Sequence, residues 1–145
     1  MKKKKSAVWL AWCATGVWCV ICLYLAGQEL TATTKLSDTL THFVLRLFEL
    51  PGQTYYMTVF DTLRQTAHIV VFMILSVLVY TAFITTTDSR RKSLLCSSAV
   101  CAALSVGTEV GKLFISGRHC SFTDMLLNLL GCTAGIVLTH IVQKY

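Results

Sequence analysis

Four long apolar blocks dominate the chain and predict membrane-spanning helices. They run from about 7 to 27, 67 to 87, 94 to 115 and 125 to 142. A helix needs roughly 20 mostly apolar residues to cross the hydrocarbon core of a bilayer. The first two blocks meet this length easily, the fourth is short, and the third reaches it only with its polar last turn. The pattern predicts an all-α membrane protein, a small four-transmembrane-helix bundle that forms one domain over residues 1–145.

A fifth segment, from about 36 to 50, is amphipathic instead of uniformly apolar. Leucine and phenylalanine recur in it at helical spacing, while polar residues such as Asp38 and His42 fall on another face. The pair Pro51-Gly52 ends the pattern. We expect this helix to lie in the outer membrane interface, either as a linker between spans or as a lid over a substrate site.

The basic residues predict the orientation of the bundle. With the N-terminus inside, eight Lys and Arg fall in cytoplasmic segments, at 2–5, 90–92 and 144, and five fall outside. Cytoplasmic segments of multi-pass proteins carry the excess of positive charge. We therefore expect both termini in the cytoplasm of a protein of the cell membrane. The first apolar block is too long for the core of a signal peptide, so we expect it to remain as an anchor.

Composition excludes several classes of function. Hydrophobic residues make up 54% of the chain and charged residues 14%, whereas a soluble domain carries about 25% charged residues. The net charge is +6, and the basic residues gather in short clusters beside the spans, where they are expected to set the orientation. We therefore expect no nucleic-acid partner. The seven cysteines form neither a disulfide framework nor a metal-ligand spacing. The sequence predicts no metal ion and no cofactor.

Six polar residues fall near the predicted outer ends of the spans. Some share a helix face, as Arg64 and His68 do at four-residue spacing. Charged groups in or beside spans are costly, and they mark either a functional site or a structural ion pair. The set is Arg64, His68, Glu109, Arg118, Asp124 and Asn128.

We expect ion pairs within this set, with Arg64 or Arg118 facing Glu109 or Asp124. One hypothesis makes the set a ligand-binding site, and another makes it a lock that only fixes helix packing. A third assigns His68 as a general acid/base with one of the two carboxylates as its partner. Asp124 has a further alternative, since a carboxylate in the first turn caps a helix.

Small residues predict where the helices pack closely. Gly131 and Gly135 form a Gly-x-x-x-Gly pair on the face of the fourth span that carries Asn128. The third span carries a stripe of small residues on the face of Glu109. Stepping back from Glu109, the stripe contains Ser105, Ala102 or Cys101, and Ser98.

Three stretches of the second half share one further pattern: 63–68 (LRQTAH), 109–118 (EVGKLFISGR) and 124–131 (DMLLNLLG). Together they resemble the VanZ-like family of bacterial membrane proteins. That family typically has Arg or Lys four residues before a His, then Glu, Gln three later, Arg in a short loop, Asp, Asn and Gly. The chain departs from the pattern at Lys112, where the family usually has Gln, and at Phe72, where Tyr often stands.

The resemblance implies a role in the cell envelope. Founding members of the family are associated with lowered susceptibility to teicoplanin-type glycopeptides, which act outside the membrane on lipid-linked wall precursors. The polar set would then bind a lipid headgroup, a wall precursor or the glycopeptide itself, with Arg64 and Arg118 holding an anionic group. The expected partner is the lipid bilayer, and the small size allows a homo-oligomer. A membrane enzyme acting on a lipid-linked substrate and an inert structural subunit remain alternatives.

Overall fold

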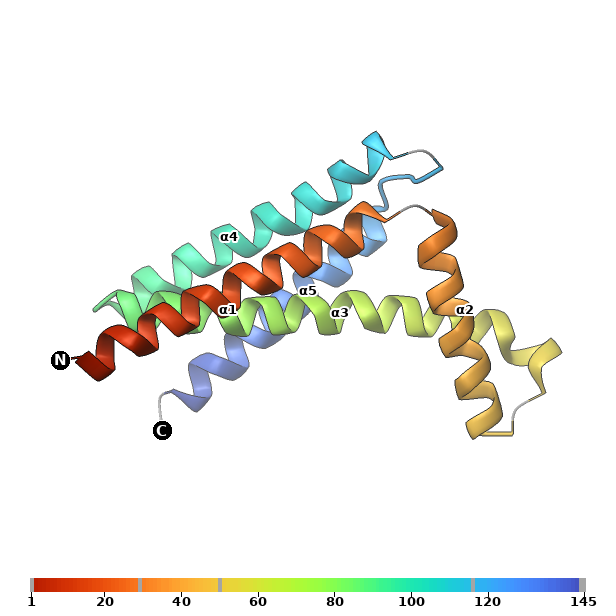
Figure 1. Cartoon of the computed structure of the whole chain (residues 1–145), viewed down its shortest axis with the longest axis horizontal. Helices are drawn as coiled ribbons and strands as arrows, with labels where there is room; N and C mark the ends of the chain where they lie inside the picture. The colour runs from red at the N-terminus through yellow and green to blue at the C-terminus, as the bar shows by residue number, and fades with distance from the viewer. Residues whose placement is uncertain (1, 29, 50, 116, 144–145) are drawn as a thin grey trace.

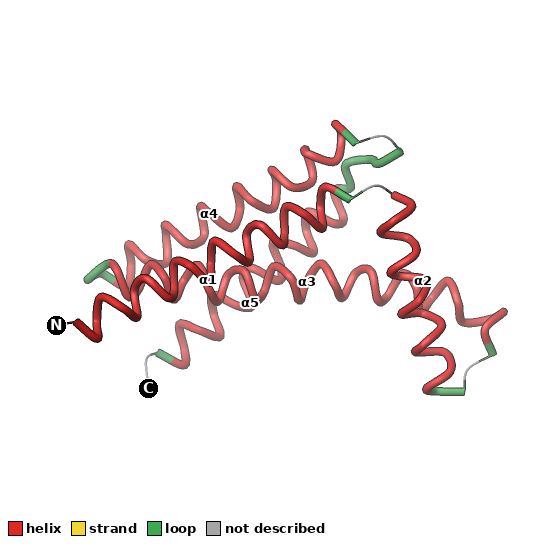
Figure 2. Tube along the Cα trace, viewed as in Figure 1, coloured by secondary structure: helices red, strands yellow, loops and turns green. Residues whose placement is uncertain are grey.

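The computed structural model describes residues 2–28, 30–49, 51–115 and 117–143, which contain five α-helices and no strand (Figures 1 and 2). The helices are α1 (Lys2–Gly27), α2 (Leu30–Leu47), α3 (Gly52–Thr86), α4 (Arg90–Gly111) and α5 (Phe122–Val142), and a short 3-10 turn, η1 (Lys112–Phe114), follows α4. In these described residues, α1, α3, α4 and α5 are long and apolar enough to cross a membrane. The prediction of an all-α protein with four spans is confirmed.

The connections between helices alternate between the two ends of the bundle. Figure 1 shows both termini and the α3–α4 turn at one end, and the α1–α2 junction and the α4–α5 loop at the other. Both ends of the chain therefore lie at the same end of the helix bundle. Which side faces the cytoplasm stays a prediction from the positive charges, one of which, Lys144, lies outside the described residues.

The helix α3 is the centre of the bundle and packs against each of the other four helices. Its most extensive contacts are with α5. The outer face of α1 is covered by little protein, since Trp9 and Leu10 are each 73% exposed. Such a face is suited to lipid, which is as apolar as the side chains themselves. The buried core comprises Cys22, Phe72, Leu75, Val79, Tyr80, Cys101, Cys132 and Ile136.

α3 begins at Gly52, well before the predicted start near 67. With 35 residues it is about 52 Å long at 1.5 Å per residue, against about 30 Å of hydrocarbon core. The predicted boundary marked the start of the unbroken apolar run and not the start of the helix. The earlier part is amphipathic and packs against α2. Its half-buried face contains Tyr56, Val59, Phe60 and Leu63.

The helix α2 crosses α3 outside the main bundle (Figure 1). It begins earlier than the predicted helix and ends at Leu47, and the last predicted residue, Leu50, lies outside the described residues. Thr41 and Leu45 are buried, whereas Phe43 is 63% exposed. One face of α2 therefore contacts protein, and a second apolar face is available to the membrane surface.

Candidate functional site

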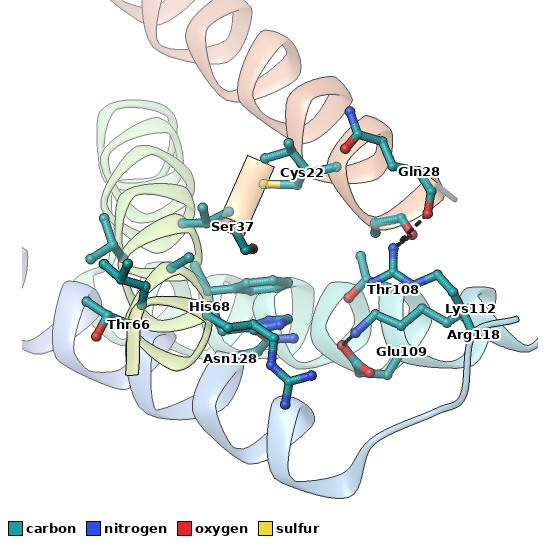
Figure 3. A pocket seen from close by; sticks show the side chains of 18 of the residues that line it. Cys22, Gln28, Ser37, Thr66, His68, Thr108, Glu109, Lys112, Arg118 and Asn128 are labelled. Carbon is teal, nitrogen blue, oxygen red and sulfur yellow. Dashed lines mark hydrogen bonds and ion pairs between the residues drawn. The ribbon is translucent and has the colours of Figure 1, made fainter. Parts of the chain in front are cut away.

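A cavity of about 420 Å³ lies where the five helices approach one another. Small-molecule sites typically have volumes of roughly 300–1,000 Å³. The aliphatic part of the wall contains Leu25, Leu40, Leu63, Val70 and Val71. The charged and hydrogen-bonding part contains Arg64, His68, Thr108, Glu109, Lys112, Arg118 and Asn128. Figure 3 shows most of these polar side chains along one side of the cavity, across from Cys22 and Ser37.

Lys112 is at the centre of the polar residues and is only 3% exposed. Its Nζ atom donates to Oε1 of Glu109 at 2.6 Å and to Oδ2 of Asp124 at 3.3 Å. Glu109 and Asp124 are themselves 1% and 5% exposed. Buried charges persist when they are paired and hydrogen-bonded. One ammonium group thus neutralises part of two buried carboxylates and joins the end of α4 to the start of α5.

The stripe of small residues on α4 explains how Glu109 becomes buried. Small side chains allow neighbouring helices to approach closely. The predicted stripe is correct for Cys101 and Ser105, which are buried. It is wrong for Ser98, which is exposed, because Ser97 takes the buried position four residues before Cys101. The buried face of α4 contains Ser93, Ser97, Cys101, Ser105, Thr108 and Glu109.

The start of α5 directs Asp124 toward Lys112. Ser121 is the N-cap of α5, and its Oγ accepts a hydrogen bond from the backbone N–H of Asp124 at 3.2 Å. The backbone N–H of Ser121 donates to Oε2 of Glu109 at 3.4 Å. The capping role considered for Asp124 therefore belongs to Ser121. The carboxylate of Asp124 gains from the helix dipole in the first turn and remains available for the ion pair.

His68 links α3 to α5. Its Nδ1 lies 2.9 Å from Oδ1 of Asn128, and its Nε2 lies 3.5 Å from Oδ2 of Asp124. An amide oxygen only accepts hydrogen bonds, so Nδ1 is the donor in the first pair. Asn128 is fully buried, while the side chain of His68 is 21% exposed. The imidazole therefore bridges an amide and a carboxylate while it lines the cavity.

Arg64 lies one helical turn before His68. Its Nη2 is 3.9 Å from Oδ1 of Asp124, which is an ion pair but too long for a hydrogen bond. The prediction that Arg64 or Arg118 faces a carboxylate is met by this pair. The side chain of Arg64 is 48% exposed and lines the cavity, so its guanidinium keeps most of its hydrogen-bonding capacity.

Arg118 also lines the cavity, but its contacts are with the end of α1. Its Nη1 donates to the carbonyl oxygens of Ala26 at 3.2 Å and Gln28 at 2.8 Å. Carbonyls at a helix C-terminus lack partners within the helix. Arg118 therefore caps α1 from the α4–α5 loop, and it takes part in no ion pair within the described part of the chain.

Gly131 and Gly135 lie where α5 meets α3. A Cβ atom added at Gly131 would come within 2.3 Å of the carbonyl oxygen of Ile69. At Gly135 it would come within 2.1 Å of Oγ of Ser76 and 2.4 Å of the carbonyl oxygen of Met73. Only glycine fits at such distances, and the close approach holds the polar start of α5 against the middle of α3.

Two buried polar atoms of the site have no hydrogen-bond partner among the described residues. They are Oδ1 of Asp124 and Nδ2 of Asn128. A buried polar atom without a partner costs about 1–3 kcal/mol, so nearly all such atoms in native proteins are satisfied. Asn128 lines the cavity, and its free N–H donor is therefore a candidate contact for a ligand.

A comparison with protein families finds that the VanZ/LLP1 model matches residues 11–143. The chain belongs to the VanZ/LLP1 family. The match begins within α1 and continues to the last residues before the C-terminus, so it covers more than the motifs of the second half. With its four candidate spans, this VanZ/LLP1 protein is a multi-pass membrane protein. A search of curated proteins and a search of solved structures gave no match.

Both departures from the VanZ-like pattern lie at the cavity of this VanZ/LLP1 protein. Lys112 joins the two buried carboxylates, and Phe72, which is 5% exposed, lines the wall one turn after His68. Lys112 is not among the six residues predicted to bind a ligand. Its three-residue spacing from Glu109 was the available signal, because that spacing places two side chains side by side on a helix.

The site offers hydrogen-bond donors beside an apolar wall. Arg64 and Asn128 have donors that the protein itself does not use fully. No group of three or more His, Cys, Asp or Glu residues within the described ranges is arranged to hold a metal ion. The chemistry that this geometry supports is binding of a molecule with a polar end and an apolar body.

Proposed function

We propose that this VanZ/LLP1 protein binds an amphiphilic molecule of the cell envelope and thereby lowers susceptibility to teicoplanin-type glycopeptides. The observation that carries the proposal is the cavity, with aliphatic residues on one part of its wall and charged residues on the other. A lipid headgroup, a lipid-linked wall precursor and the drug are the candidate ligands. The residues that we assign to the site are Arg64, His68, Glu109, Arg118, Asp124 and Asn128.

The proposed residues differ in their roles. Arg64, His68 and Asn128 line the cavity with groups that can contact a ligand. Glu109 and Asp124 hold the ammonium group of Lys112, and Asp124 also pairs with Arg64. Arg118 fixes the end of α1 beside the cavity.

The position of α2 supports a lid over the cavity. Ser37 and Leu40 of α2 line the wall. Leu40 is 48% exposed, so it also reaches the surface that a ligand entering from the lipid would cross. A linker helix that only rested on the membrane surface would not be expected to contribute residues to the wall of the cavity.

The orientation that the charges predict gives the site access to envelope molecules. The cavity residues from the α1–α2 junction and the α4–α5 loop lie at the end of the bundle opposite the termini (Figure 1). With both termini in the cytoplasm, as we propose, this end lies at the outer leaflet. Glycopeptides act on the outer side of the membrane, where assembled wall precursors are exposed.

Filling the cavity tests the proposal. Ala67 is exposed and lines the cavity, so Ala67→Trp blocks it without removing any charged group. In a Gram-positive host that lacks the protein, wild-type expression should raise the inhibitory concentration of teicoplanin, and A67W should return it to that of the empty host. Ala99→Trp, on an exposed position of α4, is the matched control. Full tolerance in a well-inserted A67W variant would contradict the proposal.

Catalysis by His68 is the second candidate function. The supporting observation is that His68 lines the cavity and that its Nε2 lies 3.5 Å from Oδ2 of Asp124, so that an imidazole protonated at Nε2 is held by the carboxylate as a general acid. His68→Gln keeps a hydrogen-bonding group of similar size. If the protein only binds, H68Q should keep much of the tolerance; if it catalyses a reaction, H68Q should lose all of it while ligand binding persists.

A further inference from the structure

Three cationic side chains line the cavity, but they are not equally free to bind a ligand. Lys112 is buried between two carboxylates. Arg118 donates to two backbone carbonyls of α1 and its junction with α2. Among the described residues, the side chain of Arg64 makes one polar contact, an ion pair at 3.9 Å, and it is 48% exposed. An anionic group in the cavity would therefore meet Arg64 first.

A second donor lies deeper on the same side of the cavity. Nδ2 of Asn128 is buried and has no hydrogen-bond partner in the described structure, while Oδ1 of the same amide accepts from His68. The hydrogen bond to His68 fixes the amide, so the free N–H groups have a defined direction. Glu109 is the acidic residue on the wall, and its Oε1 already accepts from Lys112. Oδ1 of Asp124 has no hydrogen-bond partner among the described residues, but Asp124 does not line the cavity. Free donors therefore prevail over free acceptors on this wall.

The two donors lie on successive levels of the helix interface. Arg64 is at the level of Asp124, and Asn128 is at the level of His68, one helical turn further along. One turn of helix rises about 5.4 Å. The two oxygens of a carboxylate lie in one plane on one carbon, whereas the oxygens of a phosphate point in several directions. A phosphate is therefore better suited to accept from both levels at once.

We propose that the cavity binds a phosphate ester carried on an apolar chain, and this inference rests on the proposed function. The guanidinium of Arg64 supplies the planar pair of N–H groups that matches phosphate oxygens. The amide of Asn128 supplies a further donor one helical turn further along the interface between α3 and α5. The aliphatic wall, from Leu25 and Leu40 to Val71, covers the chain that carries the phosphate. Partial exclusion of water from the cavity strengthens the charged contact.

Binding of defined lipids to the purified protein tests this inference. The full chain in detergent is mixed with dioleoyl phosphatidic acid, with dioleoylglycerol, with oleate, or with inorganic phosphate, and occupancy is measured by native mass spectrometry. Phosphatidic acid should bind, and dioleoylglycerol, which has the same chains without the phosphate, should bind at least tenfold more weakly. Oleate should also bind more weakly, because it offers a single carboxylate.

Two variants change the proposed donors. Arg64→Gln should weaken phosphatidic acid binding about tenfold or more, which corresponds to about 1.4 kcal/mol. Arg46→Gln, at an exposed position on α2, makes the same change in net charge away from the cavity and should leave binding unchanged. Asn128→Asp keeps an acceptor for His68 but replaces the donor with a negative group, and it should abolish binding. Thermal unfolding of each variant checks that it is folded.

The outcomes separate the two proposals. Equal binding of phosphatidic acid to R64Q and R46Q overturns the phosphate inference. Equal binding of oleate, or displacement of the lipid by an equimolar amount of inorganic phosphate, overturns it as well. If dioleoylglycerol binds as tightly as phosphatidic acid and A67W blocks both, the proposed function stands without the phosphate. If no lipid binds and A67W changes nothing in the susceptibility assay, both proposals fail.

Discussion

His68 of α3 and Asn128 of α5 are joined by a 2.9 Å hydrogen bond across 60 positions of sequence. The same offset recurs at three more contacts along the two helices: Arg64 with Asp124, Phe72 with Cys132, and Tyr80 with His140. A constant offset means that α3 and α5 run parallel and meet at four-residue steps. The candidate site is therefore one part of a regular helix interface, and its geometry depends on the packing of the whole interface.

A methyl group at Gly135 should disturb this interface. The added Cβ would lie 2.1 Å from Oγ of Ser76 and 2.4 Å from a backbone carbonyl of α3. We expect Gly135→Ala to destabilise the protein by about 1–3 kcal/mol, since overpacking forces neighbouring groups to move. Gly107→Ala is the control, because nothing lies within 4 Å of its added Cβ, and alanine favours a helix over glycine. Denaturation in detergent with SDS should show opposite shifts for the two variants.

Much of the fold could be predicted from the sequence because spans are recognised by local composition. A run of apolar residues needs no knowledge of its neighbours, so all four spans were found. The early start of α3 was missed because residues 52–66 are amphipathic and bury their apolar face against α2. Such a segment is stable as a helix only when it packs against its partner helix. A search for uniformly apolar runs does not detect it.

The residues of the candidate site were predicted to different degrees. Arg64, His68 and Asn128 could be found because polar groups in or beside apolar spans stand out. The contact of Lys112 with Asp124 and the contacts of Arg118 could not, since each depends on how the α4–α5 loop folds back. The partners of Arg118 are backbone carbonyls at the end of α1 and just after it. Every residue has a backbone carbonyl, so the sequence does not indicate which carbonyls accept a hydrogen bond.

Removing the charge of Lys112 should cost more than removing any exposed charge. Lys112→Met leaves the buried Glu109 without its cation and leaves Asp124 with only its longer contacts to Arg64 and His68. Breaking a buried pair costs roughly 3–5 kcal/mol. Lys112→Gln keeps donors for both carboxylates and should cost less. Lys92→Met, at an exposed position near the start of α4, is the matched control. SDS denaturation of the purified variants measures the free energies of unfolding.

A second substitution should relieve the defect in the Lys112 variant. Adding Glu109→Gln to K112M removes the carboxylate that the loss of Lys112 leaves without a cation, so the double variant should be more stable than K112M alone. The non-additivity of a double-mutant cycle measures this coupling. Equal stability of K112M and K112M/E109Q would mean that the ammonium of Lys112 does not stabilise the carboxylate of Glu109.

Arg118→Ala should loosen the end of α1. The substitution removes both hydrogen bonds that hold the carbonyls of Ala26 and Gln28. Hydrogen exchange followed by mass spectrometry should show faster exchange in the last turn of α1. Arg90→Ala removes a similar contact at the opposite end, where Arg90 donates to the carbonyl of Gln143. Exchange at the end of α1 should be unchanged in R90A, and equal effects of both variants would exclude a specific cap.

Chemical labelling of two loops tests the orientation on which the proposed function depends. Cys120 is exposed in the α4–α5 loop, and Asp88 is exposed in the α3–α4 turn. With both termini in the cytoplasm, a membrane-impermeant maleimide should label Cys120 in intact cells, and Cys120→Ser should remove that signal. In the C120S background, Asp88→Cys should be labelled only after permeabilisation. The reverse pattern would place the cavity at the cytoplasmic leaflet, where a glycopeptide outside the cell cannot reach it.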